Sequence, residues 1–205
     1  MSIVKLNNNG VKNATAFGSI TGLGDLALIK KITASSSANI SFVNGASSVV
    51  LDSTYKEYIF TFNNIHPATD GANFTYQFSI DGGSNYNTTI TSTAFNAQIT
   101  EGNSDAVLAY QAGSDLAQGT GFSPIKSVGG DNDQSLSGTA RLFEPSSTVF
   151  VKHFMFETNH VTDSNYQNHQ FEAGYVNSTS AVNAVQFKMS SGNIDAGSIS
   201  LYGVN

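Results

Sequence analysis

The segment NFTYQFSI, residues 73–80, alternates strictly between apolar and polar side chains. A β-strand points successive side chains to opposite faces of its sheet, so this period of two predicts a strand with one buried face. The same alternation recurs at residues 56–64 (KEYIFTFNN) and 183–189 (NAVQFKM). It returns at residues 198–202 (SISLY), almost at the end of the chain, where we expect the last strand to be paired within a sheet.

The whole chain predicts an all-β fold. About nine to eleven short strands are separated by turn signals such as Asp81-Gly82-Gly83, and no long stretch has the period of an amphipathic helix. Short strands at regular spacing favour an antiparallel β-sandwich of a jelly-roll-like subtype. We assign residues 25–205 to this sandwich domain.

Three segments of the domain are less regular. Residues 106–111 fit either a short helix or a strand. Residues 149–156 (VFVKHFMF) are apolar on both faces, which predicts a strand that is central or covered on both sides, with His153 packed or hydrogen-bonded inside it. Residues 168–176 (NHQFEAGYV) predict a further strand, whose apolar face carries Phe171, Ala173 and Tyr175.

Residues 1–24 have neither the period of a strand nor that of a helix. One interpretation is a frayed terminus, since chain ends are often poorly ordered. The other is an extended N-terminal arm that contacts a neighbouring subunit or a larger particle. We treat this segment as a separate arm for attachment or oligomer contact.

Composition excludes several classes of protein. Charged residues make up only 12% of the chain, the net charge is −6, and the nine Lys and Arg residues are scattered. Because a nucleic-acid-binding protein carries a basic face, we expect no nucleic-acid partner. The chain has no cysteine, so it forms neither disulfides nor thiolate sites. It has no apolar run long enough to span a bilayer and no signal-peptide core at its N-terminus, so we expect no membrane span and no export by the secretory route.

Motifs for catalysis or cofactor binding are absent from the sequence. The glycine-rich stretch GSITGLGD has the wrong spacing for a dinucleotide site, and there is no P-loop or nucleophile elbow. His160 and His169 flank a predicted loop and could form a zinc pair, but their spacing is not diagnostic. Asp131 and Asp133 could bind calcium, but they lack the rest of a calcium loop. We therefore expect no catalytic residue, no cofactor and no metal.

Residues that could face a ligand or receptor lie near predicted loops. Trp is absent, so the available aromatic platforms for a sugar are Tyr86, Tyr110 and Tyr166, each of which could instead be a packing residue. Together with His160 and His169 they are the tentative receptor-facing loop residues. The irregular region 100–133 is a further candidate, because binding sites are often carried by loops on a rigid scaffold.

Three stretches carry a resemblance to a known family. They are DSTYKEYIFTFNNIHPATDGANFTYQFSIDGGSNY (residues 52–86), LFEPSSTVFVKHF (142–154) and STSAVNAVQFKMSSGNIDAGSISLYGV (178–204). Together they resemble virion structural proteins of tailed bacteriophages of the marine or cyanophage type, which have a tail-fibre-like β-sandwich domain. The chain departs from the family pattern at Lys56, where an acidic residue is usual, and in region 100–133.

The resemblance implies a non-enzymatic virion protein that is assembled in the host cytoplasm. It favours a tail-fibre or spike-like component for host adsorption by receptor binding. The expected partners are other copies of the chain in a homotrimer, other virion proteins contacted through the arm, and a glycan or protein of the host surface. One alternative is a capsid decoration or head-fibre protein that stabilises the shell. Another is a carbohydrate-binding or polysaccharide-degrading domain.

Overall fold

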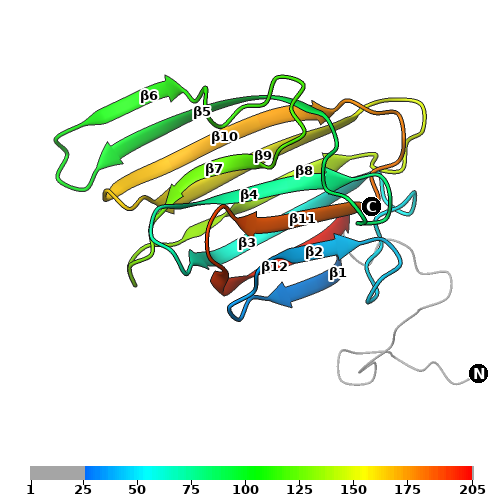
Figure 1. Cartoon of the computed structure of the whole chain (residues 1–205), viewed down its shortest axis with the longest axis horizontal. Coiled ribbons are helices and arrows are strands. Elements are labelled where there is room, and N and C mark those ends of the chain that lie inside the picture. The colour runs from blue at the N-terminus through cyan, green and yellow to red at the C-terminus, as the bar shows by residue number, and fades with distance from the viewer. Residues whose placement is uncertain (1–25, 205) are drawn as a thin grey trace, which may run out of the picture.

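The computed structural model describes residues 26–204, so the predicted arm at residues 1–24 lies outside the described part of the chain. This part is all-β, as predicted, and forms two antiparallel sheets packed as a sandwich (Figure 1). It contains no helix, and hence none that is long and apolar enough to cross a membrane. Its twelve strands are β1 (Leu26–Thr33), β2 (Ile40–Val43), β3 (Glu57–Pro67), β4 (Ala72–Ser79), β5 (Ile90–Thr100), β6 (Ala106–Tyr110), β7 (Ser123–Val128), β8 (Leu136–Phe143), β9 (Lys152–Val161), β10 (Tyr166–Val176), β11 (Ala184–Met189) and β12 (Ile194–Val204).

The two sheets differ in size. The large sheet has the order β1-β12-β3-β8-β9-β10-β5-β6, and the small sheet has the order β2-β11-β4-β7. Without β5, β6, β9 and β10, the remaining strands form two four-stranded sheets, β1-β12-β3-β8 and β2-β11-β4-β7. This order supports the jelly-roll-like subtype, which stays a prediction. The four extra strands widen the large sheet, so that β5 and β6 lie beyond the small sheet (Figure 1).

Aromatic residues of the alternating segments fill the space between the sheets. Phe62 of β3 lies 5.3 Å from both Phe74 of β4 and Phe187 of β11, measured between ring centroids. Tyr76 of β4 stacks on Phe156 of β9 at 3.9 Å. Burial of one such side chain contributes about 1.5–3 kcal/mol, so this cluster is a major source of stability.

The last strand is paired on both sides, which confirms the prediction for residues 198–202. Within β12, Ile199 lies opposite Ile32 of β1 and opposite Phe62 of β3. The register with β3 shifts near Gly197, which has a φ of +104°. A side chain at this glycine would meet the backbone carbonyl of Asn64, so glycine is required by space as well as by conformation.

Of the two alternatives for residues 149–156, the central position holds and the cover on both faces does not. The strand begins only at Lys152, and Phe150, which precedes it, is 69% exposed. On β9 the side chain of Met155 is 52% exposed, and His153 is exposed rather than packed. The strand is central within its sheet, but only one of its faces is covered by the second sheet.

Lys152, the first residue of β9, lies on the buried face of this strand. Its side chain is buried, and Nζ donates hydrogen bonds to the backbone carbonyl oxygens of Ser147 (3.1 Å), Phe150 (3.2 Å) and Ser178 (2.7 Å). Burial lowers the pKa of this amine. Lys152 therefore ties the β8–β9 connection to the segment that follows β10.

The apolar residues of β10 were expected to face the core, but they face outward. Phe171, Ala173 and Tyr175 lie on the outer face of the large sheet, whereas the buried side chains are Asn168, Gln170 and Glu172. In the segment 106–111, for which helix and strand were both open, residues 106–110 form strand β6.

Candidate functional site

A polar groove lies where the large sheet extends past β7. It has a volume of about 210 Å³, and its walls come from β5, β7, β10 and the segments around residues 111 and 162–164. The regions 100–133 and 158–170, which are distant in sequence, meet here. We call it the amide groove, after the side chains that dominate it, namely Asn96, Gln98, Gln111, Asn168 and Gln170, with Tyr166 beside them.

The pairing of β5 with β10 places four of these amides side by side. Asn96 lies directly opposite Gln170, and Gln98 lies directly opposite Asn168. Positions two apart on a strand share a face, so all four side chains project from the inner face of the sheet. Asn96, Asn168 and Gln170 are buried, and each is 5% exposed or less.

Hydrogen bonds orient the amides. Asn96 Nδ2 donates to Gln98 Oε1 (3.1 Å) and to Asn168 Oδ1 (3.0 Å), while Asn96 Oδ1 accepts from Gln111 Nε2 (2.6 Å). Gln98 and Asn168 thus use their carbonyl oxygens inside the network. Among residues 26–204, no acceptor is hydrogen-bonded to Gln98 Nε2 or to Asn168 Nδ2, so both amino groups remain available.

The rim of the groove contains one phenol and charges of both signs. The Tyr166 hydroxyl donates to Asp105 Oδ2 (3.2 Å), and this hydrogen bond raises the pKa of Tyr166. Lys126 and Asp163 also line the groove. Two carboxylates and one amine thus lie at or beside the rim, whereas the floor is neutral.

His160 does not face outward from a loop, so that expectation is wrong. It lies on β9 with 1% of its side chain exposed, opposite Asn168 of β10, and its Nε2 is 2.8 Å from the backbone oxygen of Lys126. Burial lowers the pKa of His160 to about 4, which keeps the ring neutral at pH 7. His160 supports the floor of the groove rather than presenting itself to a ligand.

The other predicted site residues lie apart from one another. Tyr166 lines the groove. His169 lies on the outer face of the sheet, with Nε2 3.0 Å from Glu157 Oε1, so His160 and His169 point to opposite faces and cannot share a zinc ion. Tyr110 is the last residue of β6. Tyr86 lies in the loop that precedes β5, whereas the groove residues Asn96 and Gln98 lie near the C-terminal end of that strand. Across the described chain, no group of three or more His, Asp or Glu residues is placed to hold a metal ion.

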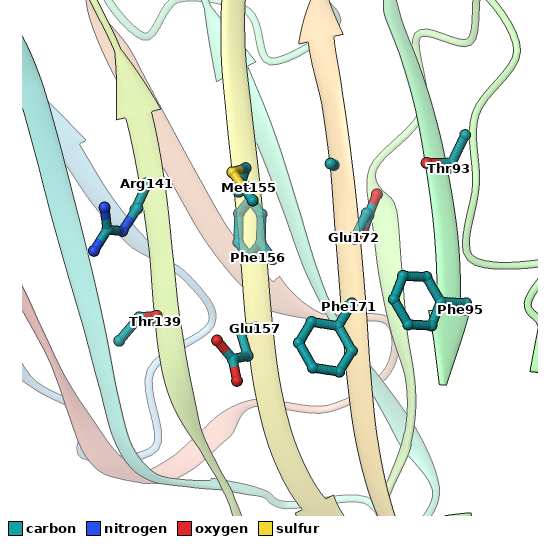
Figure 2. Close-up of a pocket in the computed structure, with 10 residues that line it drawn as sticks. Thr93, Phe95, Thr139, Arg141, Met155, Phe156, Glu157, Phe171 and Glu172 are labelled. Carbon is teal, nitrogen blue, oxygen red and sulfur yellow. The ribbon is translucent and has the colours of Figure 1, made fainter. Parts of the chain in front are cut away.

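A second candidate surface is a depression on the outer face of the large sheet (Figure 2). Its volume is about 290 Å³. Phe95 and Phe171 stack on its β5–β10 side with ring centroids 5.0 Å apart, Arg141 lies on its β8 side, and Met155 and Glu157 of β9 lie between them (Figure 2). We call it the outer depression.

The apolar surface continues from the outer depression to the edge strand β6. Leu108 of this strand is 75% exposed, and residues 106–110 (AVLAY) carry no charge. The opposite edge strand, β1, carries Lys30 and Lys31 and has an irregular register beside them. Lysines and bulges prevent edge-to-edge pairing, so β1 is protected against another strand and β6 is open to one.

One acidic residue with a strongly shifted pKa lies between the sheets. Glu172 Oε1 accepts hydrogen bonds from the Tyr76 hydroxyl (2.6 Å) and from Ser123 Oγ (2.7 Å), and its other oxygen, Oε2, is buried without a partner among residues 26–204. Burial raises the pKa of Glu172 to about 7 and raises that of Tyr76 well above its usual value. This carboxyl group is enclosed by the core and 2% exposed, so it does not reach a ligand.

Sequence reasoning missed the amides and Glu172, although a signal was present. Polar residues occupy every second position of β10, at Asn168, Gln170 and Glu172, and most such positions of β5, at Ser92, Asn96 and Gln98, with Ala94 as the exception. Two paired strands with the same polar period indicate a shared polar face. Comparisons with protein family models, with curated proteins and with solved structures found no match.

Proposed function

We propose that this protein is a non-enzymatic structural component of a tailed-bacteriophage virion and acts in host adsorption, as a tail fibre or spike-like protein. The motif resemblance supports the virion assignment. The observation that carries the adsorption role is the widening of the large sheet by β5, β6, β9 and β10. These strands add two binding surfaces, the outer depression and the amide groove, to a rigid sandwich.

The chemistry of the two surfaces supports binding rather than catalysis. The acid whose pKa is raised into the neutral range, Glu172, is enclosed between the sheets. Beside the outer depression, Glu157 Oε1 lies 3.0 Å from His169 Nε2, and Arg141 forms an ion pair with Glu57. The amide groove presents neutral hydrogen-bonding groups, which bind and orient a ligand but do not transfer protons at neutral pH.

We further propose separate roles for the two surfaces. The apolar outer depression and the open edge of β6 contact a second copy of the chain, because uncharged edge strands pair readily with one another. This contact builds the expected homo-oligomer. The amide groove lies on the inner face of the same sheet and stays free for the host surface.

Localisation in the particle tests this proposal. Antibodies raised against the purified protein are applied with gold labels to intact virions of the encoding phage, and the purified virions are analysed by mass spectrometry. We expect label on tail fibres or the tail tip. Label over the capsid would favour the decoration alternative, and a protein missing from purified particles would refute the proposal.

A further inference from the structure

We propose that the amide groove binds a neutral glycan, with one pyranose residue seated among Gln98, Asn168, Gln111 and Tyr166. The inference deepens the proposed function and rests on it, since it names the chemical class recognised on the host surface. Three observations carry it: the free hydrogen-bonding groups of the groove, its charge and its size.

The free groups match those of a sugar. Gln98 Nε2 and Asn168 Nδ2 are donors held in place by the bonds that their own carbonyl oxygens accept from Asn96. Gln111 donates through Nε2 to Asn96, and its Oε1 accepts no hydrogen bond from any residue in the range 26–204. The groove therefore offers two neighbouring donors, on Gln98 and Asn168, and one acceptor, on Gln111. Hydroxyl groups both donate and accept, so a polyhydroxylated ligand satisfies this pattern without carrying a charge.

The charges around the groove favour neither sign strongly and disfavour anions more. Lys126 and Asp163 have opposite charges at the rim, Asp105 adds a second carboxylate beside Tyr166, and the floor consists of amides. An anionic ligand would be attracted by Lys126 but repelled by Asp163 and Asp105, and a cationic ligand would be repelled by Lys126. A buried amide left without a partner costs about 1–3 kcal/mol, so a ligand that satisfies the floor is favoured over one that only pairs with the rim.

The size of the groove fits one ring of a longer chain. Its volume of about 210 Å³ is below the ~300–1,000 Å³ of pockets that enclose a drug-sized molecule. The side chain of Tyr166, partly buried at the rim, offers an apolar ring face to the C–H groups of a sugar. The ligand is therefore a polysaccharide or glycan that crosses the groove and places one residue in it.

Isosteric substitutions separate recognition from folding. Gln98→Glu and Asn168→Asp keep the carbonyl-type oxygen that accepts from Asn96 and replace the free amino group with a second oxygen. Gln167→Glu is the matched control, since it makes the same chemical change on β10, at a position facing the opposite side of the sheet. Thermal melting and circular dichroism establish that each variant is folded.

The probes are the methyl glycosides of glucose, galactose, mannose and N-acetylglucosamine, each at about 50 mM, which populates even a millimolar complex. Side-chain amide signals are followed by two-dimensional NMR in the full chain. We expect at least one glycoside to shift the signals of Asn96, Gln98 and Asn168. We expect Gln98→Glu and Asn168→Asp to weaken this binding about tenfold or more, and Gln167→Glu to bind like the wild type.

Two results would overturn the inference. One is that none of the glycosides shifts the groove amides. The other is that the folded Gln98→Glu variant binds as tightly as the Gln167→Glu control. The outcome is distinct from that of the labelling experiment. If the protein is found in virions but binds no glycoside, only the glycan site is refuted. If it binds a glycoside but is missing from virions, only the virion role is refuted.

Discussion

Glu172 and His160 should have opposite and compensating effects on the pH dependence of the free energy of unfolding. Replacing Glu172 with Gln removes one of the two effects and makes the other measurable. Burial raises the pKa of Glu172 from 4.5 to about 7 and lowers the pKa of His160 from 6.5 to about 4. Between about pH 4.5 and 6.5, the unfolded chain carries a proton on His160 and none on Glu172, while the folded chain carries a proton on Glu172 and none on His160. The two states bind equal numbers of protons, so these two residues together give no slope.

The magnitude follows from the two shifts. Glu172 is protonated in the folded state, so its contribution to stability is full below pH 4.5 and is lost as the pH rises to about 7. A shift of about 2.5 units corresponds to a loss of about 3 kcal/mol, and no discount for solvent is needed because the side chain is 2% exposed. His160 contributes in the opposite sense: its folded pKa is depressed, so stability is lost as the pH falls from 6.5 to about 4.

Glu172→Gln mimics the protonated carboxyl group, since its Oε1 can still accept from Tyr76 and Ser123. Urea unfolding of the wild type and the variant is measured at pH 4.5, 5.5, 6.5 and 7.5. We expect the stability of the variant relative to the wild type to grow by about 3 kcal/mol from the lowest to the highest pH. The converse variant, His160→Gln, should lose stability relative to the wild type over the same range. A difference between Glu172→Gln and wild type that stays constant with pH would refute this reasoning.

Three further predictions concern other parts of the structure. Lys152→Met leaves three carbonyl oxygens without their shared donor, so we expect a loss of about 2–4 kcal/mol in urea unfolding, and unchanged stability would show that these bonds contribute nothing net. Leu108→Lys puts a charge on the edge strand β6, so light scattering should fall from a multiple of 21.6 kDa to a single chain, whereas a wild-type monomer would contradict the assembly surface. Gly197→Ala brings a side chain against the backbone of Asn64 and should lower stability by about 1–3 kcal/mol, while Gly82→Ala, where the added methyl group meets open space, is the control for strain at positive φ alone.

The parts of the fold that the sequence predicts well are those where one sheet covers the other. In β3, β4, β11 and β12 the alternating apolar residues face the opposite sheet, so the period of two identifies the core-facing side of each strand. It does not predict that the other side is exposed: Gln77 and Ser79 of β4 and Ser200 of β12 are buried too, so the expectation of one buried face is wrong for β4. The placement of the C-terminal strand follows from the same rule. The structure also shows that residues 106–110 form strand β6. The sequence left helix and strand both open here, because a short apolar run fits either.

The parts that the sequence predicts poorly are those where the large sheet extends past the small one. On β10 the apolar residues Phe171 and Ala173 face outward and Asn168 and Gln170 face inward, because the inner face there meets the polar backbone of β7 and its flanking segments. Periodicity identifies two faces but not which one is covered. Among the residues predicted to face a receptor from loops, Tyr166 lines the groove, whereas His160 lies on strand β9.

The reversal on β10 links the two candidate surfaces physically. A strand has two faces, and turning its apolar side chains outward forces its polar side chains inward. The outward pair Phe95–Phe171 and the inward amides Asn96 and Gln170 are therefore consequences of one choice of orientation. This orientation leaves a buried amide network and an exposed apolar patch. Both destabilise an isolated chain unless the free amide groups find hydrogen-bond partners and the patch is covered. A second subunit on the outer face and a hydroxylated ligand in the groove would satisfy both, which is why we assign assembly and recognition to opposite faces of the same strands.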